Sequence, residues 1–131
     1  MSAGEGATDA FAEVRAVLLR YFDALHHSDA NALGDVLHPA AIYATASDGT
    51  LLHLDMATYL PMVARRPSPA SKGEPRRDRI VSIEFAGPVT ARACVECAIA
   101  PKRFTDFLTL LRVDGRWQIV AKVFHFEIEQ P

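Results

Sequence analysis

The spacing of apolar residues changes along this 131-residue chain from a helical to a strand-like period, and the change falls near residue 78. In the first half, apolar residues recur at spacings of three and four, which places them on one stripe of a helix. In the second half they alternate with polar residues, as in a half-buried strand. Helices followed by strands indicate an α+β domain with the helices on one face of an antiparallel sheet.

The first half predicts three helices and one hairpin. The first helix is capped by Thr8 or Asp9, and the second begins after Ser28 or Asp29 and stops before Pro39. The predicted ranges are 9–27 and 30–37 for these helices, 41–45 and 51–54 for the hairpin strands, and 56–63 for the third helix. Pro61 is expected to kink or loosen that third helix.

The second half predicts four strands, over 81–85, 89–99, 104–113 and 117–128. Asp114-Gly115 is the strongest hairpin signal in the chain. Strands of ten or more residues twist and curl, so this sheet is expected to be strongly curved. A curled sheet closed by helices leaves a cavity at its wide end.

Composition limits what such a domain can be. The length suits one domain, which we place over residues 8–128, with an unordered segment over 1–7. The first ten residues have no signal-peptide pattern, and no stretch is apolar enough to span a bilayer, so we expect a cytoplasmic protein without a membrane partner. A formal net charge of −2 gives no reason to expect nucleic acid. We expect no cofactor and no metal.

Three strings resemble a known family. They are Tyr21–Leu25 (YFDAL), Leu37–Ala41 (LHPAA) and, most specifically, Asp106–Val120 (DFLTLLRVDGRWQIV). The chain resembles the nuclear transport factor 2-like superfamily, in particular its SnoaL-like or putative lumazine-binding branch. The resemblance implies a cone-shaped, cystatin-like α+β fold with a pocket inside the cone, and a homodimer built through the outer sheet faces. It implies no reaction, because the superfamily holds isomerases, dehydratases, cyclases and proteins that only bind.

Histidine and aromatic residues are the candidate pocket residues. His125 continues the alternating apolar set 117, 119, 121 and 123, so it is expected at the cavity, where it could bind a ligand or move a proton near neutral pH. His53 is expected beside the pocket mouth. Tyr43, Tyr59 and Phe107 are expected as pocket walls, because such rings combine an apolar body with, for tyrosine, a polar tip.

Asp106 is the third candidate catalytic residue, with His125 and His53. If it points into the cone, burial raises its pKa and makes it a candidate base. Strand alternation groups Phe107 with Thr109 and Leu111, and this set looks more like the core than the set that contains Asp106. We therefore favour an outward-facing Asp106 in the dimer interface, near Lys122.

Two further patterns receive an ordinary structural interpretation. Cys94 and Cys97 have C-x-x-C spacing, but they lie on a predicted strand, and redox or zinc motifs need a turn or a helix start. Six basic residues between Arg65 and Arg79 form either a solvated loop, which we favour, or a rim that recruits an anionic ligand or a partner.

Three functional hypotheses remain open. The first is a domain that binds a small, largely apolar molecule inside the cone. The second is a cofactor-independent isomerase, dehydratase or cyclase that uses a pocket histidine or aspartate. The third is a dimeric accessory or interaction protein that works through the outer sheet face. We favour the first.

Overall fold

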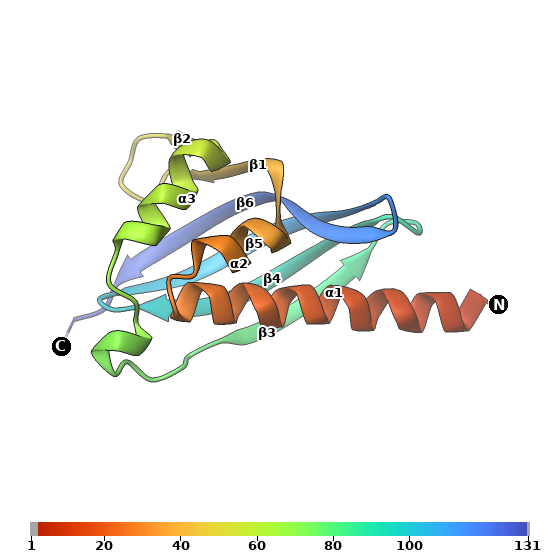
Figure 1. Ribbon diagram of the computed structural model, residues 1–131, viewed down its shortest axis with the longest axis horizontal. Coiled ribbons are helices and arrows are strands. Elements are labelled where there is room, and N and C mark those ends of the chain that lie inside the picture. The colour runs from red at the N-terminus through yellow and green to blue at the C-terminus, as the bar shows by residue number, and fades with distance from the viewer. Residues whose placement is uncertain (1–2, 131) are drawn as a thin grey trace.

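The computed structural model describes residues 3–130, with side chains described from Asp9 onward. Its elements are α1 (Ala3–His26), α2 (Ala30–Val36), β1 (Leu37–Thr45), β2 (Leu52–Leu54), α3 (Met56–Arg65), the 3-10 helix η1 (Ala70–Lys72), β3 (Arg79–Phe85), β4 (Thr90–Ile99), β5 (Lys102–Val113) and β6 (Arg116–Ile128). Three helices are followed by the long strands of one sheet, which confirms the predicted α+β class (Figure 1).

The six strands lie in the order β2-β1-β6-β5-β4-β3. All neighbours are antiparallel except β1 and β6, which are parallel, so the sheet is mixed rather than purely antiparallel. The prediction missed this pair because β1 was assigned to a separate hairpin with β2. A parallel pair needs a long connection, and the segment from β2 to β5 supplies it.

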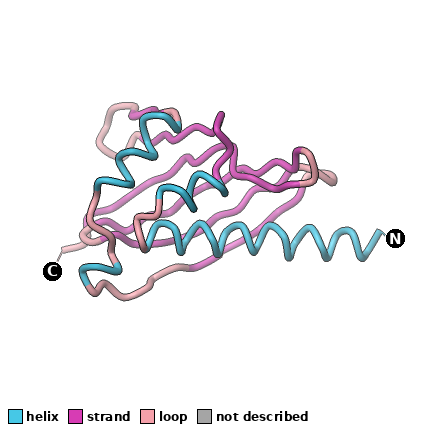
Figure 2. Tube along the Cα trace, in the orientation of Figure 1, coloured by secondary structure: helices cyan, strands magenta, loops and turns pink. Residues whose placement is uncertain are grey.

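The helices cover one face of the sheet (Figure 2). Helix α1 runs along β3 and β4 (Figure 1). Helix α3 packs against β1, toward the C-terminal end of β6 (Figure 1). Within residues 3–130, no helix is both long enough and apolar enough to cross a lipid bilayer.

Helix α1 begins at Ala3, upstream of the cap predicted at Thr8 or Asp9. The segment 1–7, expected to be unordered, lies partly outside the described residues, and the domain boundary at 8 stays a prediction. The predicted apolar stripe is buried at Val14, Leu18 and Tyr21, which sets the face of α1 toward the sheet.

The shorter helices begin at the predicted aspartates. The Asp29 carboxylate accepts a hydrogen bond from the Ala32 amide at 3.0 Å, and Asp55 accepts one from Thr58 at 2.9 Å. Each caps an amide that has no partner within its helix. Pro61 lies inside α3, which continues to Arg65.

A β-bulge in β6 divides the sheet interior into two zones. Thr109 of β5 lies opposite Ala121, but the next residue, Leu110, lies opposite Ile119, so Val120 is an extra residue in β6. An extra residue reverses which faces the following side chains occupy. Ile119 therefore points into the core before the bulge, and Lys122 does so after it.

Candidate functional site

Asp106 lies inside the cone, fully buried, with an exposed fraction of 0%. It is a residue of β5 whose face also carries the buried Leu108 and Leu110. The predicted outward orientation is therefore wrong. Alternation grouped the residues of β5 correctly but could not decide which group faces the helices.

Tyr21, from the last turns of α1, holds this carboxylate. Its hydroxyl donates a hydrogen bond to Asp106 Oδ2 at 2.5 Å, and both groups are buried. Burial, followed by the negative charge of Asp106, raises the pKa of Tyr21 well above its ordinary value. The phenol therefore stays protonated and donates. Asp106 Oδ1 is buried and has no hydrogen-bond partner among the described residues.

Lys122 of β6 is the second buried charge, with 5% of its surface exposed. Its ammonium lies 5.1 Å from the ring centroid of Tyr21 and 5.4 Å from those of Tyr43, Tyr59 and Phe124. Lys122 Nζ also lies 3.4 Å from the hydroxyl of Tyr59. Aromatic faces attract a cation, so these four rings form a cage around the charge.

The pKa of Lys122 is set by opposing effects. Burial lowers it, while the oxygens of Tyr59 and Asp106 raise it, and the net direction is upward. The side chain is therefore a charged ammonium near neutral pH, and not the neutral amine that attacks carbonyl groups. The structure places Lys122 near Asp106, as expected, but inside the cone rather than at its outer face. One feature of the sequence could have indicated this buried lysine, namely that Lys122 is a single charge between the apolar residues Ala121 and Val123.

The predicted wall residues Tyr43 and Tyr59 do come together. Their rings stack with centroids 4.4 Å apart, and Phe124 meets Tyr43 edge-on at 4.8 Å. Phe104 extends this wall, 5.8 Å from Phe124. Rings from β1, α3 and β6 therefore lie around the Lys122 ammonium, and Phe104 of β5 continues the aromatic wall beyond Phe124.

Arg66, directly after α3, brings a second cation to this end of the cone. Its Nε and Nη2 atoms are buried and have no hydrogen-bond partner among the described residues. The buried thiol of Cys97 on β4 completes the set, and burial raises its pKa to about 12. That thiol is neutral at ordinary pH, which agrees with the inert interpretation of the C-x-x-C spacing. Together these residues make the interior less apolar than predicted.

His125 and Phe107 lie on the outer face, and their predicted place in the pocket is wrong. His125 is exposed because the bulge at Val120 reverses the alternation on which the prediction relied. Its ring nitrogen Nδ1 lies 3.2 Å from the Ser47 hydroxyl. Phe107 is 66% exposed, on the opposite face of β5 from Asp106. His53 is exposed on β2, one of the two edge strands.

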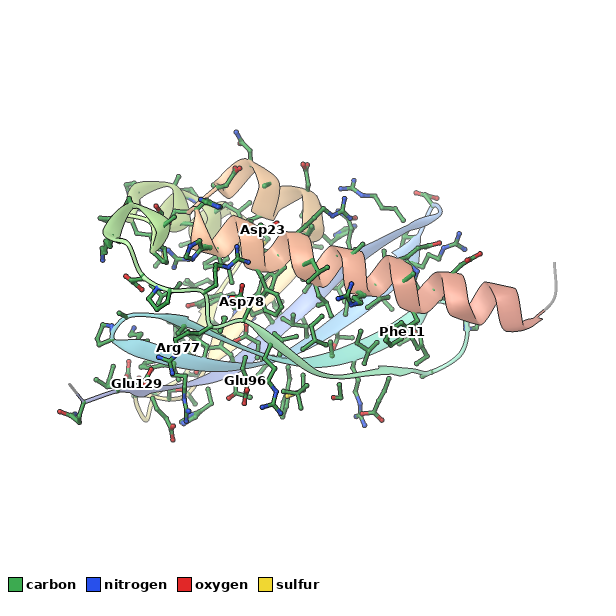
Figure 3. All side chains as sticks on the ribbon, turned by 90° about the horizontal axis from the view of Figure 1, so that it is seen from below. Phe11, Asp23, Arg77, Asp78, Glu96 and Glu129 are labelled. Atoms are coloured by element: carbon green, nitrogen blue, oxygen red, sulfur yellow. The ribbon has the colours of Figure 1, made fainter. Side chains whose placement is uncertain are left out.

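A cleft of about 680 Å³ lies outside the cone, between α1 and the edge strand β3. Arg76 bridges its two sides through ion pairs to Asp23 at 2.9 Å and Asp78 at 2.5 Å. Phe11 lies at the other end of the cleft, toward the start of α1 (Figure 3). These pairs tie the irregular basic segment to the first helix.

The chain also matches a known protein family. A family model described as putative lumazine-binding matches residues 9–125, which is most of the chain. The chain belongs to this putative lumazine-binding family.

Solved structures share the fold of this chain. An NTF-2 like protein of unknown function from Silicibacter pomeroyi is 26% identical, with 92% of this chain and 98% of that chain covered and a TM-score of 0.82. A cystatin-like fold protein from Burkholderia xenovorans is 21% identical over 94% of this chain and 95% of that one, with a TM-score of 0.69. They confirm the predicted nuclear transport factor 2-like, cystatin-like fold.

One curated relative matches locally. Aldolase FrzH from a Cladobotryum species is 45% identical over 40 residues. The match covers 29% of this chain and 32% of that protein, so the chain matches about a third of this relative's length.

Proposed function

We propose that this domain binds a small molecule inside its cone, between the Asp106–Tyr21 pair and the aromatic cage of Lys122. The observation that carries the proposal is a buried carboxylate oxygen, Asp106 Oδ1, without a partner among the described residues. Buried polar atoms are nearly always hydrogen-bonded, so such an atom in a cone interior is suited to a ligand donor. The description of the family supports small-molecule binding.

The chemistry of the interior suggests how a ligand is held. Asp106 Oδ1 accepts a hydrogen bond from an N–H or O–H group of the ligand. The Lys122 ammonium and the Tyr59 hydroxyl donate to a carbonyl oxygen. The stacked rings of Tyr43 and Tyr59 contact a planar apolar body.

Titration with lumazine, followed by its fluorescence, tests the proposal. Asp106→Asn and Lys122→Met should each raise the Kd by about ten- to hundredfold, the usual effect of losing a hydrogen bond to a charged group. His125→Ala is the matched control, because His125 lies on the same strand but faces outward, and its Kd should equal that of the wild type. Binding that is absent, or that is equal in all four proteins, would contradict the proposal.

A second candidate function is proton transfer without a cofactor. It rests on Asp106, which has one oxygen held by Tyr21 and the other unpartnered among the described residues. In this role Oδ1 removes a proton next to a carbonyl group, Lys122 and Tyr59 stabilise the oxyanion, and Asp106 returns the proton to the substrate. The local match to an aldolase adds weight to enol chemistry.

Hydrogen–deuterium exchange of cyclohexanone in D2O, followed by NMR, tests this second role. The wild type should accelerate exchange at the carbon next to the carbonyl, and Asp106→Asn should abolish the acceleration. The control His125→Ala should keep it. Exchange at the rate of buffer alone would leave only the binding function.

Homodimerisation through the outer sheet face is part of the proposal. Val81, Phe107 and Val123 are exposed apolar residues of that face, and Arg92 and Glu84 form an ion pair on it at 3.1 Å. An exposed apolar patch on a sheet favours a protein contact. Sedimentation of the wild type should give a dimer, and Phe107→Glu should give a monomer of 14.3 kDa.

A further inference from the structure

The cone interior carries more positive than negative charge. Lys122 and Arg66 are cations, and Asp106 is the carboxylate that lies among them. Among the described residues, neither cation forms an ion pair with a carboxylate. Both influence the same groups, because each lowers the pKa of Tyr43 and of Cys97 against the larger upward effect of burial. Arg66 directly follows the helix whose buried face carries Tyr59, and the Lys122 ammonium lies 3.4 Å from the Tyr59 hydroxyl, so both cations lie at the same end of the cone.

The two cations differ in how far neighbouring groups replace the water that they lost on burial. The rings around Lys122, with the Tyr59 hydroxyl, replace part of the water that its ammonium lost on burial. Arg66 Nε and Nη2 are buried without any acceptor among the described residues. Arg66 as a residue is only partly buried, but desolvated N–H donors without an acceptor are unfavourable, so this buried edge of its guanidinium is suited to an anionic partner.

The unpartnered atoms of Arg66 form one recognition edge. Nε and Nη2 lie on the same side of the guanidinium, and their N–H bonds are parallel, which matches the two oxygens of a carboxylate. Another arginine of this protein binds a carboxylate through the same two atoms. Arg92 donates from Nε and Nη2 to the two oxygens of Glu84, at 3.1 Å and 3.2 Å.

We infer that the cone binds a planar carboxylate, whose two oxygens accept from the Nε–Nη2 edge of Arg66 and whose apolar body lies against the aromatic wall of Tyr43, Tyr59 and Phe104. The inference rests on the proposed binding function and adds the charge and shape of the ligand. The Lys122 ammonium provides a second favourable interaction with the anion. Asp106 Oδ1 remains the acceptor for a hydroxyl or amino group at the far end of the ligand.

A charge-matched pair of probes tests the inference. 2-Naphthoate and 2-naphthamide have nearly the same shape, but only the first is an anion. Calorimetric titration should give the naphthoate a Kd at least about tenfold lower than the amide, as expected for a bidentate charged contact. Arg66→Gln should bring the two Kd values together. Arg65→Gln is the matched control, because Arg65 is the exposed neighbour at the end of α3, and it should keep the preference.

The outcomes separate the inference from the function on which it rests. If both probes bind equally well to the wild type and Lys122→Met weakens both, the cone is a binding site but the ligand is not selected for its charge. If lumazine binds and neither naphthyl probe does, the inference fails and the binding function stands. If lumazine and both probes fail to bind, both are overturned. A preference that survives in Arg66→Gln would show that Arg66 is not the carboxylate contact.

Discussion

The two ends of the β5–β6 hairpin are built from the same strands but have opposite interiors. Near the turn, Leu110, Ile119 and Trp117 are buried in the apolar core. Toward the other end, the inward positions are Asp106, Lys122 and Phe124, and two buried charges replace the aliphatic side chains. The bulge at Val120 separates these ends. The difference shows that stability and the candidate site occupy different parts of one sheet, so substitutions should be able to separate them.

The largest expected effect is at the apolar end. Leu110→Ala should lower the free energy of unfolding by about 2–5 kcal/mol, because it removes buried methyl groups and leaves a cavity. Urea unfolding measures the loss, and Val113→Ala on the exposed end of β5 serves as the control. The lumazine Kd of the folded variant should stay unchanged. A changed Kd would show that the two ends are coupled.

At the polar end, Tyr21→Phe should lower the free energy of unfolding by about 1–3 kcal/mol, because the substitution leaves Asp106 Oδ2 buried without its donor. Tyr43→Phe provides a matched control, since Tyr43 is only half-buried. Its loss in urea unfolding should be smaller than that of Tyr21→Phe. Equal losses for both variants would mean that the 2.5 Å hydrogen bond between Tyr21 and Asp106 does not contribute measurably to stability.

Alkaline pH should weaken the polar end through Cys97. Its folded pKa of about 12 lies above the ordinary 9.0, so the unfolded chain loses the thiol proton first. The contribution of the Cys97 thiol to the free energy of unfolding is fully present below pH 9 and is lost as the pH rises toward 12. Between pH 9 and 10 this loss is about 1 kcal/mol. The free energy of unfolding of Cys97→Ala should therefore fall less steeply with pH than that of the wild type, and parallel slopes would exclude Cys97 as a cause.

The smallest effect on stability is expected for Lys122→Met, although its effect on binding is large. Methionine keeps most of the apolar length of the side chain against the surrounding rings, so the substitution loses the interactions of the ammonium with Tyr59 and Asp106 but also removes its desolvation cost. The Tm, measured by circular dichroism, should therefore fall less than that of Tyr21→Phe, while lumazine binding weakens. A fall in Tm as large as that of Leu110→Ala would make Lys122 a structural residue and would remove the contrast between the two ends.

Local patterns were enough to predict most elements of the fold. The helical stripe containing Leu18 and Tyr21 is buried, Asp29 and Asp55 cap their helices, and Asp114-Gly115 joins β5 to β6. These features depend on neighbours three to four residues away or on a two-residue turn, so the sequence carries them directly. The parallel pairing of β1 with β6 joins segments more than 70 residues apart, and no local signal encodes it.

The candidate site was predicted only in part, because its residues depend on which strand face is buried. Tyr43 and Tyr59 lie together as expected, but His125 and Phe107 point outward and Lys122 was not expected inside.

By itself, the sequence determined the element types, the α+β order and the family, since these follow from short-range periodicity and from matching strings. Tertiary structure alone decided that Asp106, Lys122 and Arg66 lie at one end of the cone. The side-chain period of a strand is two, so one extra residue at Val120 exchanges the inner and outer faces of everything that follows it.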